Sequence, residues 1–101
     1  MKNTIKKAIK ESNLNGYKWT IKGNKLFWSY LTKEYFEIKT GVVSESNIQF
    51  VKVIYKNPIL EDETFICIFV GDDNLICDAK TIDEAIEKAV KQTIRKANTT
   101  F

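Results

Sequence analysis

The hydrophobic positions of this chain follow a helical period at both ends and a strand period between them. Near the N-terminus, Ile5, Ala8 and Ile9 are spaced i, i+3 and i+4, which predicts an amphipathic helix over residues 3–13. The lysines of this segment lie mostly on the opposite face of that helix. The helix is expected to end before Gly16, because glycine favours helix termination.

A strict alternation of apolar and polar residues from residue 17 onward predicts a β-hairpin. Gly23 and Asn24 suit its two-residue turn, because glycine adopts positive φ without steric cost. With this turn, Lys22 faces Lys25 on the return strand, which covers residues 25–31, and the register is fixed. The pairs that share one face of the hairpin are then Ile21 with Leu26, Trp19 with Trp28, and Tyr17 with Tyr30.

Four further segments have the composition or alternation of strands. They cover residues 34–40, 48–55, 65–70 and 75–79. Residues 65–70 are apolar at every position, which predicts a central strand that is buried on both faces.

The C-terminal segment is predicted to be a second amphipathic helix. Thr81 and Glu84 have the spacing of a capping box. Two i, i+4 ion pairs are expected on its exposed side, Glu84–Lys88 and Glu87–Lys91. Its apolar stripe consists of Ala85, Ile86, Ala89, Val90, Ile94 and Ala97.

The order of these elements is helix, about six strands, helix, with short connections between consecutive strands. Short connections favour antiparallel pairing, and two helices with one apolar stripe each pack most simply on one side of a sheet. The sequence therefore predicts a single α+β domain over residues 1–101, with a mostly antiparallel sheet of about five to six strands and both helices on one face.

Composition narrows the chemistry that this domain can perform. The chain has no histidine and two cysteines, Cys67 and Cys77. These counts exclude serine–histidine and cysteine–histidine catalytic pairs and a four-cysteine zinc site. We therefore expect no enzymatic activity, no cofactor and no metal site, and we expect both cysteines to be reduced core thiols.

No apolar run approaches the roughly 20 residues that a membrane-spanning helix needs. The first twelve residues, MKNTIKKAIKES, are too charged for the apolar segment of a secretory signal. We therefore expect a cytoplasmic location and no membrane association.

Charge is unevenly distributed along the chain, although its net value is only +3. Residues 1–33 contain eight lysines and one acid, whereas residues 34–87 contain twelve acids and four lysines. Residues 88–101 contain four basic residues and no acid. This asymmetry favours a molecule with one basic and one acidic region.

Three features are candidates for contact with a partner. The aromatic pairs of the hairpin are either a core face under a helix or an exposed platform. The lysines beside them are typical of proteins that bind single-stranded nucleic acid, although the near absence of arginine disfavours bidentate recognition of bases and phosphates. The acids of residues 61–63 are either a solvated loop or a negative surface for a basic partner.

These observations favour a small non-enzymatic protein-binding module: an inhibitor, an adaptor or an accessory factor, with a homodimer as an open alternative. A lysine- and asparagine-rich chain of this size also suits a phage or mobile-element anti-defence protein. The alternatives are a weak nucleic-acid-binding protein that uses the lysine-rich helix and the hairpin, and an enzyme that uses only carboxylates or tyrosine. The residues expected to contact a partner are Lys6, Lys10, Trp19, Trp28, Tyr30, Glu61, Asp62 and Glu63.

Overall fold

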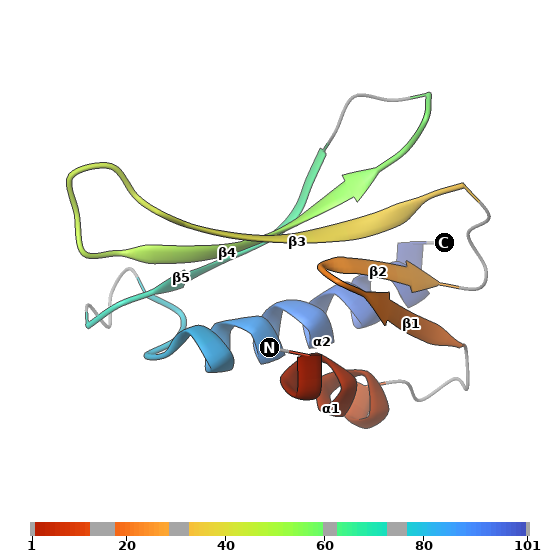
Figure 1. Ribbon diagram of the computed structural model, residues 1–101, viewed down its shortest axis with the longest axis horizontal. Coiled ribbons are helices and arrows are strands. Elements are labelled where there is room, and N and C mark those ends of the chain that lie inside the picture. Colours follow the sequence, from red (N-terminus) through yellow and green to blue (C-terminus); the bar gives the residue numbers. More distant parts are fainter. Residues whose placement is uncertain (1, 13–17, 29–32, 60–62, 73–76, 101) are drawn as a thin grey trace.

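The computed structural model describes residues 2–12, 18–28, 33–59, 63–72 and 77–100. The elements follow one another as α1 (Lys2–Ser12), β1 (Trp19–Lys22), β2 (Lys25–Trp28), β3 (Tyr35–Val42), β4 (Gln49–Lys56), β5 (Glu63–Val70) and α2 (Ile82–Thr100). The five strands form one antiparallel sheet in the order β1-β2-β3-β4-β5. Both helices lie on the same side of this sheet, which confirms the predicted α+β class (Figure 1).

The β1–β2 hairpin has the register that its sequence predicts. Trp19 pairs with Trp28, and Lys22 pairs with Lys25 across the turn. Gly23 has a φ of 62°, a left-handed conformation that a side chain would disfavour. Asn24 joins this turn to β3, because its carbonyl oxygen accepts from the Ile38 amide at 2.8 Å and its Nδ2 donates to the Ile38 carbonyl at 3.1 Å.

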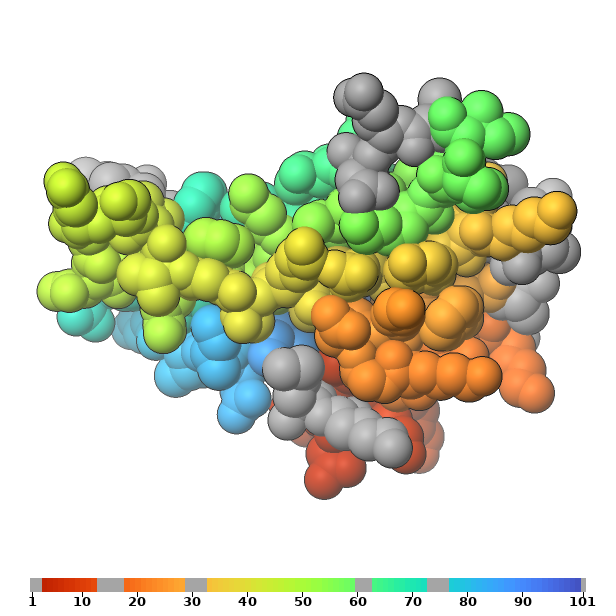
Figure 2. Space-filling view, turned by 45° about the horizontal axis from the view of Figure 1, so that its top comes forward, coloured from red at the N-terminus to blue at the C-terminus, as the bar shows by residue number. Residues whose placement is uncertain are grey.

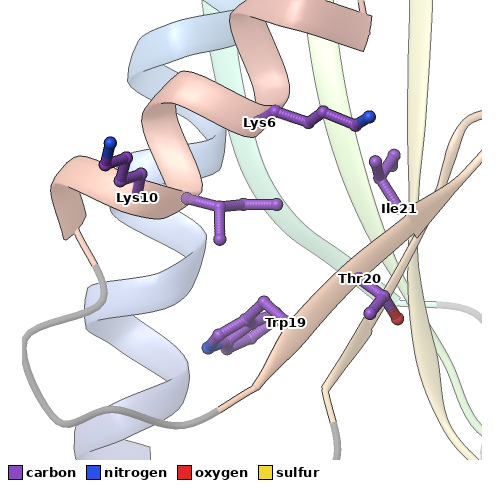
Figure 3. A pocket seen from close by; sticks show the side chains of 6 residues that line it. Lys6, Lys10, Trp19, Thr20 and Ile21 are labelled. Atoms are coloured by element: carbon purple, nitrogen blue, oxygen red, sulfur yellow. The ribbon is translucent and has the colours of Figure 1, made fainter.

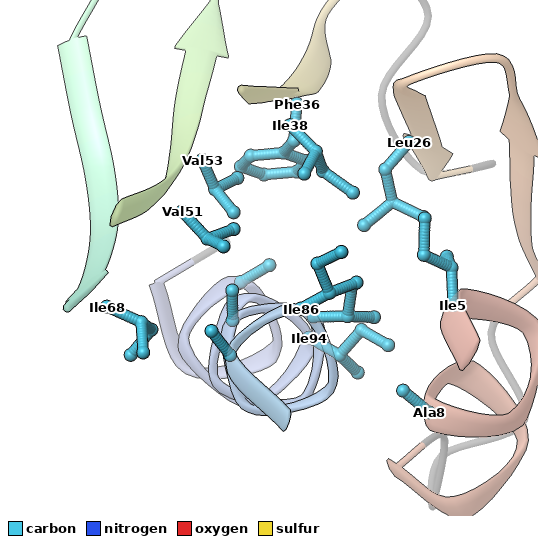
Figure 4. Packing of buried hydrophobic residues seen from close by; sticks show 14 of the residues in the cluster. Ile5, Ala8, Leu26, Phe36, Ile38, Val51, Val53, Ile68, Ile86 and Ile94 are labelled. Carbon is cyan, nitrogen blue, oxygen red and sulfur yellow. The ribbon is translucent and has the colours of Figure 1, made fainter. Parts of the chain in front are cut away.

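The core lies between the sheet and the two helices. Phe36 and Val53 of the sheet face Ile86 and Ile94 of α2, and Leu26 approaches Ile5 of α1 (Figure 4). Every member of the apolar stripe predicted for α2 is buried. Burying one such aliphatic or aromatic side chain contributes about 1.5–3 kcal/mol, so this layer contributes most of the favourable free energy of folding.

Thr93 is also buried in the stripe of α2, although its hydroxyl is polar. The hydroxyl donates to the Ala89 carbonyl at 2.7 Å and is thereby satisfied within the helix.

The capping of α2 differs in part from the prediction. The Glu84 amide donates to Thr81 Oγ1 at 3.1 Å, but the Glu84 carboxylate accepts from the Lys80 amide and not from that of Thr81. The Glu84–Lys88 and Glu87–Lys91 ion pairs both form.

The position predicted for the apolar run in residues 65–70 is wrong. These residues belong to β5, which is the last strand of the sheet and not a central one. Its outer edge is nevertheless covered: Lys96 Nζ donates to the Phe65 carbonyl at 3.1 Å and lies 4.3 Å from the Phe65 ring centre. The expected burial on both faces is not met either, because Ile68 and Val70 are buried, whereas Phe65, Ile66, Cys67 and Phe69 are half-buried.

The return strand predicted for residues 75–79 is not formed by the part of it that the structure describes. Ala79 makes an isolated parallel bridge to Val70, and the amides of Asp78 and Ala79 both donate to the Phe69 carbonyl. This short segment covers the outer edge of β5 at the end opposite Lys96.

Cys67 and Cys77 are free, half-buried thiols. Among the described residues, no helix is both long and apolar enough to cross a membrane.

Helix α1 is attached to α2 by packing and by an ion pair. Ile5 and Ala8 are fully buried, and the Glu11 carboxylate lies 2.8 Å from Lys91 Nζ. Lys91 also contacts Glu87 at 2.8 Å, so one ammonium group bridges the two helices. The hydrogen bond from Lys91 lowers the pKa of Glu11 below its ordinary value.

Truncation of Leu26 tests the core between the hairpin and α1. Leu26 is fully buried, so Leu26→Ala is expected to lower the free energy of unfolding by about 2–5 kcal/mol through lost burial and the cavity that remains. The control is Val42→Ala on β3, where the side chain is 58% exposed and the change is expected to stay within about 0.5 kcal/mol. Urea unfolding of both variants gives the two values, and equal losses would contradict the assigned core.

The pH dependence of stability tests the link between the helices. Because the pKa of Glu11 is lower in the folded state, its contribution is complete above the unfolded-state pKa and is lost as the pH falls through the folded-state pKa. Glu11→Gln is therefore expected to lower the thermal midpoint at neutral pH and to leave it unchanged in acid. A difference from the wild type that is the same at every pH would contradict the Glu11–Lys91 pair.

Candidate binding site at the edge of the sheet

A groove of about 330 Å³ lies between α1 and the edge strand β1. Its lining residues are Lys6, Ile9, Lys10, Trp19, Thr20 and Ile21, and we call it the α1–β1 groove (Figure 3). Three of the residues that the sequence placed at a partner surface, Lys6, Lys10 and Trp19, therefore meet in one place.

Helix and strand periodicity bring these side chains together. Lys6 and Lys10 are one turn apart on α1, so they share a face of the helix. Trp19 and Ile21 are two residues apart on β1, so they point to the same side of the sheet. Figure 3 shows both of these side chains directed toward α1, with the Lys6 side chain extending toward Ile21. The groove thus has an apolar floor and a cationic rim.

The floor of the groove is held by a stack of two tryptophans. The rings of Trp19 and Trp28 are 5.0 Å apart and inclined by only 5°. Trp19 is 6% exposed and Trp28 is 2% exposed, so the core interpretation of the aromatic pairs is confirmed for these two residues. Trp28 is almost completely covered, so it has nearly no surface for direct contact with a partner. Its ring stacks on Trp19 and thereby supports the floor of the groove.

The indole nitrogen of Trp19 is a buried donor without a partner among the described residues. A buried N–H that makes no hydrogen bond costs about 1–3 kcal/mol, and such groups are uncommon in folded proteins. The nitrogen itself has almost no accessible surface, although other atoms of Trp19 line the groove, so it is not a contact that the groove offers to a bound molecule.

The outer edge of β1 offers main-chain groups as well. A two-residue turn makes Lys22 and Lys25 a hydrogen-bonded pair, so Trp19 and Ile21 belong to the alternate, non-hydrogen-bonded pairs. Their N–H and C=O groups consequently point away from β2. Between described residues, no hydrogen bond joins them to another segment, whereas the edge of β5 is covered by Lys96 and Ala79.

The charge around the groove is positive. Lys6 and Lys10 are exposed on α1, and Lys18 and Lys22 are exposed at the two ends of β1. No acidic side chain lines the groove in the described part of the chain. Glu11, the acid of α1, is held by Lys91 on the side of α2. An anionic group is the natural complement of this rim.

The side of the sheet opposite the helices, which we call the helix-free face, also carries lysines and aromatic rings. In the space-filling view, the hairpin (orange) and β3 and β4 (yellow to green) form a continuous surface, with the helices (red and blue) below it (Figure 2). Lysine ammonium groups lie over three of its rings, at 5.9 Å for Lys22–Phe27, 5.2 Å for Lys25–Tyr35 and 5.0 Å for Lys52–Phe50. These lysines cover the rings and make the face compatible with water.

The other residues predicted to contact a partner do not join the groove. Glu63 is exposed at the start of β5, where it pairs with Tyr55. Tyr30, Glu61 and Asp62 lie outside the described residues. Sequence reasoning missed Ile9, Thr20 and Ile21 as groove residues. The patterns did place Ile9 and Ile21 on apolar faces, but their partial exposure follows from the position of α1 at the edge of the sheet.

Two side chains that can act as nucleophiles, Cys67 and Tyr55, have raised pKa values. Burial raises the pKa of the Cys67 thiol, so the thiolate is disfavoured at neutral pH. Burial, together with the hydrogen bond to Glu34, raises the pKa of the Tyr55 phenol. Within the described ranges, no group of three or more Cys, Asp or Glu side chains is placed to hold a metal ion.

Comparison with known proteins gave no match to this chain among protein-family models, curated proteins or solved structures.

Tryptophan emission tests the floor and the rim of the groove. In Trp28→Phe, which retains Trp19, we expect emission at short wavelength and weak quenching by acrylamide, because Trp19 is buried. The residual quenching should be stronger for iodide than for caesium, because the rim is positive. Adding Lys6→Gln and Lys10→Gln should remove that preference. A water-like emission spectrum in Trp28→Phe would contradict the buried floor.

Proposed function

We propose that this protein is a non-enzymatic protein-binding module that holds a segment of its partner in the α1–β1 groove. The observation that carries the proposal is the convergence of an open strand edge, an apolar floor and two exposed lysines at one place. An inhibitor, an adaptor or an accessory factor would each act in this way, and an anti-defence protein of a phage or mobile element is one such inhibitor. The cytoplasmic location stays a prediction.

The groove suits a polypeptide better than a small cofactor. Its volume of about 330 Å³ is at the lower end of the range for ligand pockets, and its wall is the edge of a strand. A polypeptide can continue along that edge, where each added residue brings further main-chain hydrogen bonds. The lysines of the rim would accelerate association with an acidic segment and would exclude basic ones.

A nucleic-acid-binding protein is the second candidate, and the helix-free face is the observation that favours it. Five strand lysines, Lys22, Lys25, Lys39, Lys52 and Lys56, lie there among aromatic rings, and Glu37 is the one acid that the described strands place on this face. Stacking with bases, however, requires rings that are accessible, and three of these rings are covered by lysine side chains. We therefore favour the groove as the functional surface.

A site-specific photo-crosslinker distinguishes the two candidates. A benzophenone amino acid replaces Ile9 of α1, which lines the groove, or Gln92 of α2, which is exposed and does not line it. On irradiation in the cells that carry the gene, we expect a protein adduct from the Ile9 position and none from the Gln92 position. Equal adducts at both positions, or adducts at Ile9 that a nuclease removes, would contradict the proposal.

The lysines of the rim supply the matched control for that adduct. Lys6→Gln combined with Lys10→Gln is expected to abolish the adduct from the Ile9 position. Lys7→Gln combined with Lys80→Gln removes the same charge at exposed positions that do not line the groove, so the adduct should persist. Loss of the adduct in both pairs would point to net charge and to nonspecific attraction.

A further inference from the structure

We infer that the occupant of the α1–β1 groove is an extended segment of another protein, which adds as a further strand beside β1 and carries two acidic residues at alternate positions. The inference rests on the proposed protein-binding function. It deepens that function by naming the conformation and the charge of the bound segment.

The main chain of β1 defines the conformation of the segment. The outward N–H and C=O groups of Trp19 and Ile21 are two residues apart along an extended strand, a spacing of about 6.7 Å. An extended polypeptide presents its own outward groups at the same interval, so the two chains can form the ladder of an ordinary sheet. A helical partner cannot do so, because its main-chain groups are bonded within the helix.

The rim of the groove defines the charge of the segment. Lys6 and Lys10 are separated by four residues of helix, or about 6 Å along the axis of α1. Alternate residues of the added strand point toward the helix side and are about 6.7 Å apart. In the free protein Lys6 extends toward Ile21, whereas the exposed Lys10 side chain points away from it (Figure 3). Lysine has a flexible stem, so Lys10 would turn over the groove when the segment binds, and two acids at positions i and i+2 would each face one lysine. The apolar parts of these side chains would cover Ile9, which is half-buried in the free protein.

A second copy of this chain does not fit the same edge. Pairing of β1 with β1 would bring the exposed lysines around this edge, Lys6, Lys10, Lys18 and Lys22, close to the same four lysines of the other copy. Like charges that face one another across paired strands destabilise the pairing. Charge complementarity thus favours an acidic segment from a different protein. Measurement of the protein's mass in solution tests this, because a dimer that pairs through β1 would contradict it.

The probe is a displayed library of random linear ten-residue peptides, selected on the intact protein and depleted on the Lys6→Gln, Lys10→Gln variant. We expect the enriched peptides to carry acidic residues at i and i+2 and to lack proline between them. Binding of a synthetic copy is measured by the emission of Trp19 in the Trp28→Phe background. The control peptide has the same composition with the two acids placed next to each other.

N-methylation of the peptide tests the strand pairing directly. Every second amide of an added strand points to β1, and the amides between them point away. Methylation of one amide that faces β1 is expected to lower affinity about tenfold through loss of a hydrogen bond and steric hindrance, and methylation of the next amide should have little effect. Equal sensitivity at successive amides would overturn the inference.

A substitution in β1 provides the reciprocal test. The Ile21 amide points away from β2, so Ile21→Pro removes an outward donor without removing a bond of the β1–β2 ladder. Peptide affinity is expected to fall about tenfold in Ile21→Pro and to change less than twofold in Ile21→Val, which keeps the amide. Should Ile21→Pro fail to fold, the methylated peptides alone decide the question.

The outcomes separate this inference from the proposed function. Enriched peptides without acids, peptides that bind as helices, or a protein that dimerises through β1 would overturn the extended acidic segment. Failure to enrich any peptide above the Lys6→Gln, Lys10→Gln variant would do the same. In each of these cases the adduct from the Ile9 position would still report whether the groove holds a protein.

Discussion

Packing of the apolar stripe of α2 is the constraint on which the rest of this protein depends, because it joins strands β4 and β5 to helix α1. One flank of the stripe is buried against β4 and β5, and the other flank meets α1 (Figure 1). Helix α1 has eleven residues, a length at which an isolated helix is marginal in water. Its place beside β1 is therefore set by α2, through the burial of Ile5 and Ala8 and through the bridge made by Lys91. The groove is a product of this arrangement: α2 positions α1, and α1 forms one wall.

The two edges of the sheet differ in what covers them. The edge of β5 is covered by the Ala79 segment and by Lys96, as is usual where self-association must be prevented. The edge of β1 is instead short and flanked by Lys18 and Lys22. Short length and lysine also discourage pairing between identical chains. The same charge, however, is attractive to an acidic strand, so protection against copies of itself and selection of a partner follow from one feature.

Much of this fold could be predicted from periodicity. The hairpin register followed from Gly23-Asn24 and the alternation around it, and the stripe of α2 followed from its helical spacing, because both patterns are local. The location of β5 could not be predicted, since an apolar strand is equally consistent with a central place and with an edge covered by a distant lysine such as Lys96. The groove was predicted in part. Lys6, Lys10 and Trp19 were singled out by charge and size, but their meeting with Ile9 and Ile21 depends on the angle between α1 and the sheet, which no local pattern encodes.

The seam between β2 and β3 has a consequence for the internal motion of the protein. All residues of β3 pair with β4, whereas the described pairs between β2 and β3 are Lys25–Glu37 and Leu26–Phe36, extended by the hydrogen bonds of Asn24. The hairpin and α1 are thus joined to the remaining layer by a narrow strip of sheet, by core packing such as the contact of Trp19 with Phe36 at 5.9 Å between ring centres, and by the contact of α1 with α2. Such a unit can open as one cooperative piece at a free energy below that of global unfolding. A ligand that rests on both α1 and β1 would close this hinge, so occupancy of the groove would slow amide exchange as far away as the turn at Gly23.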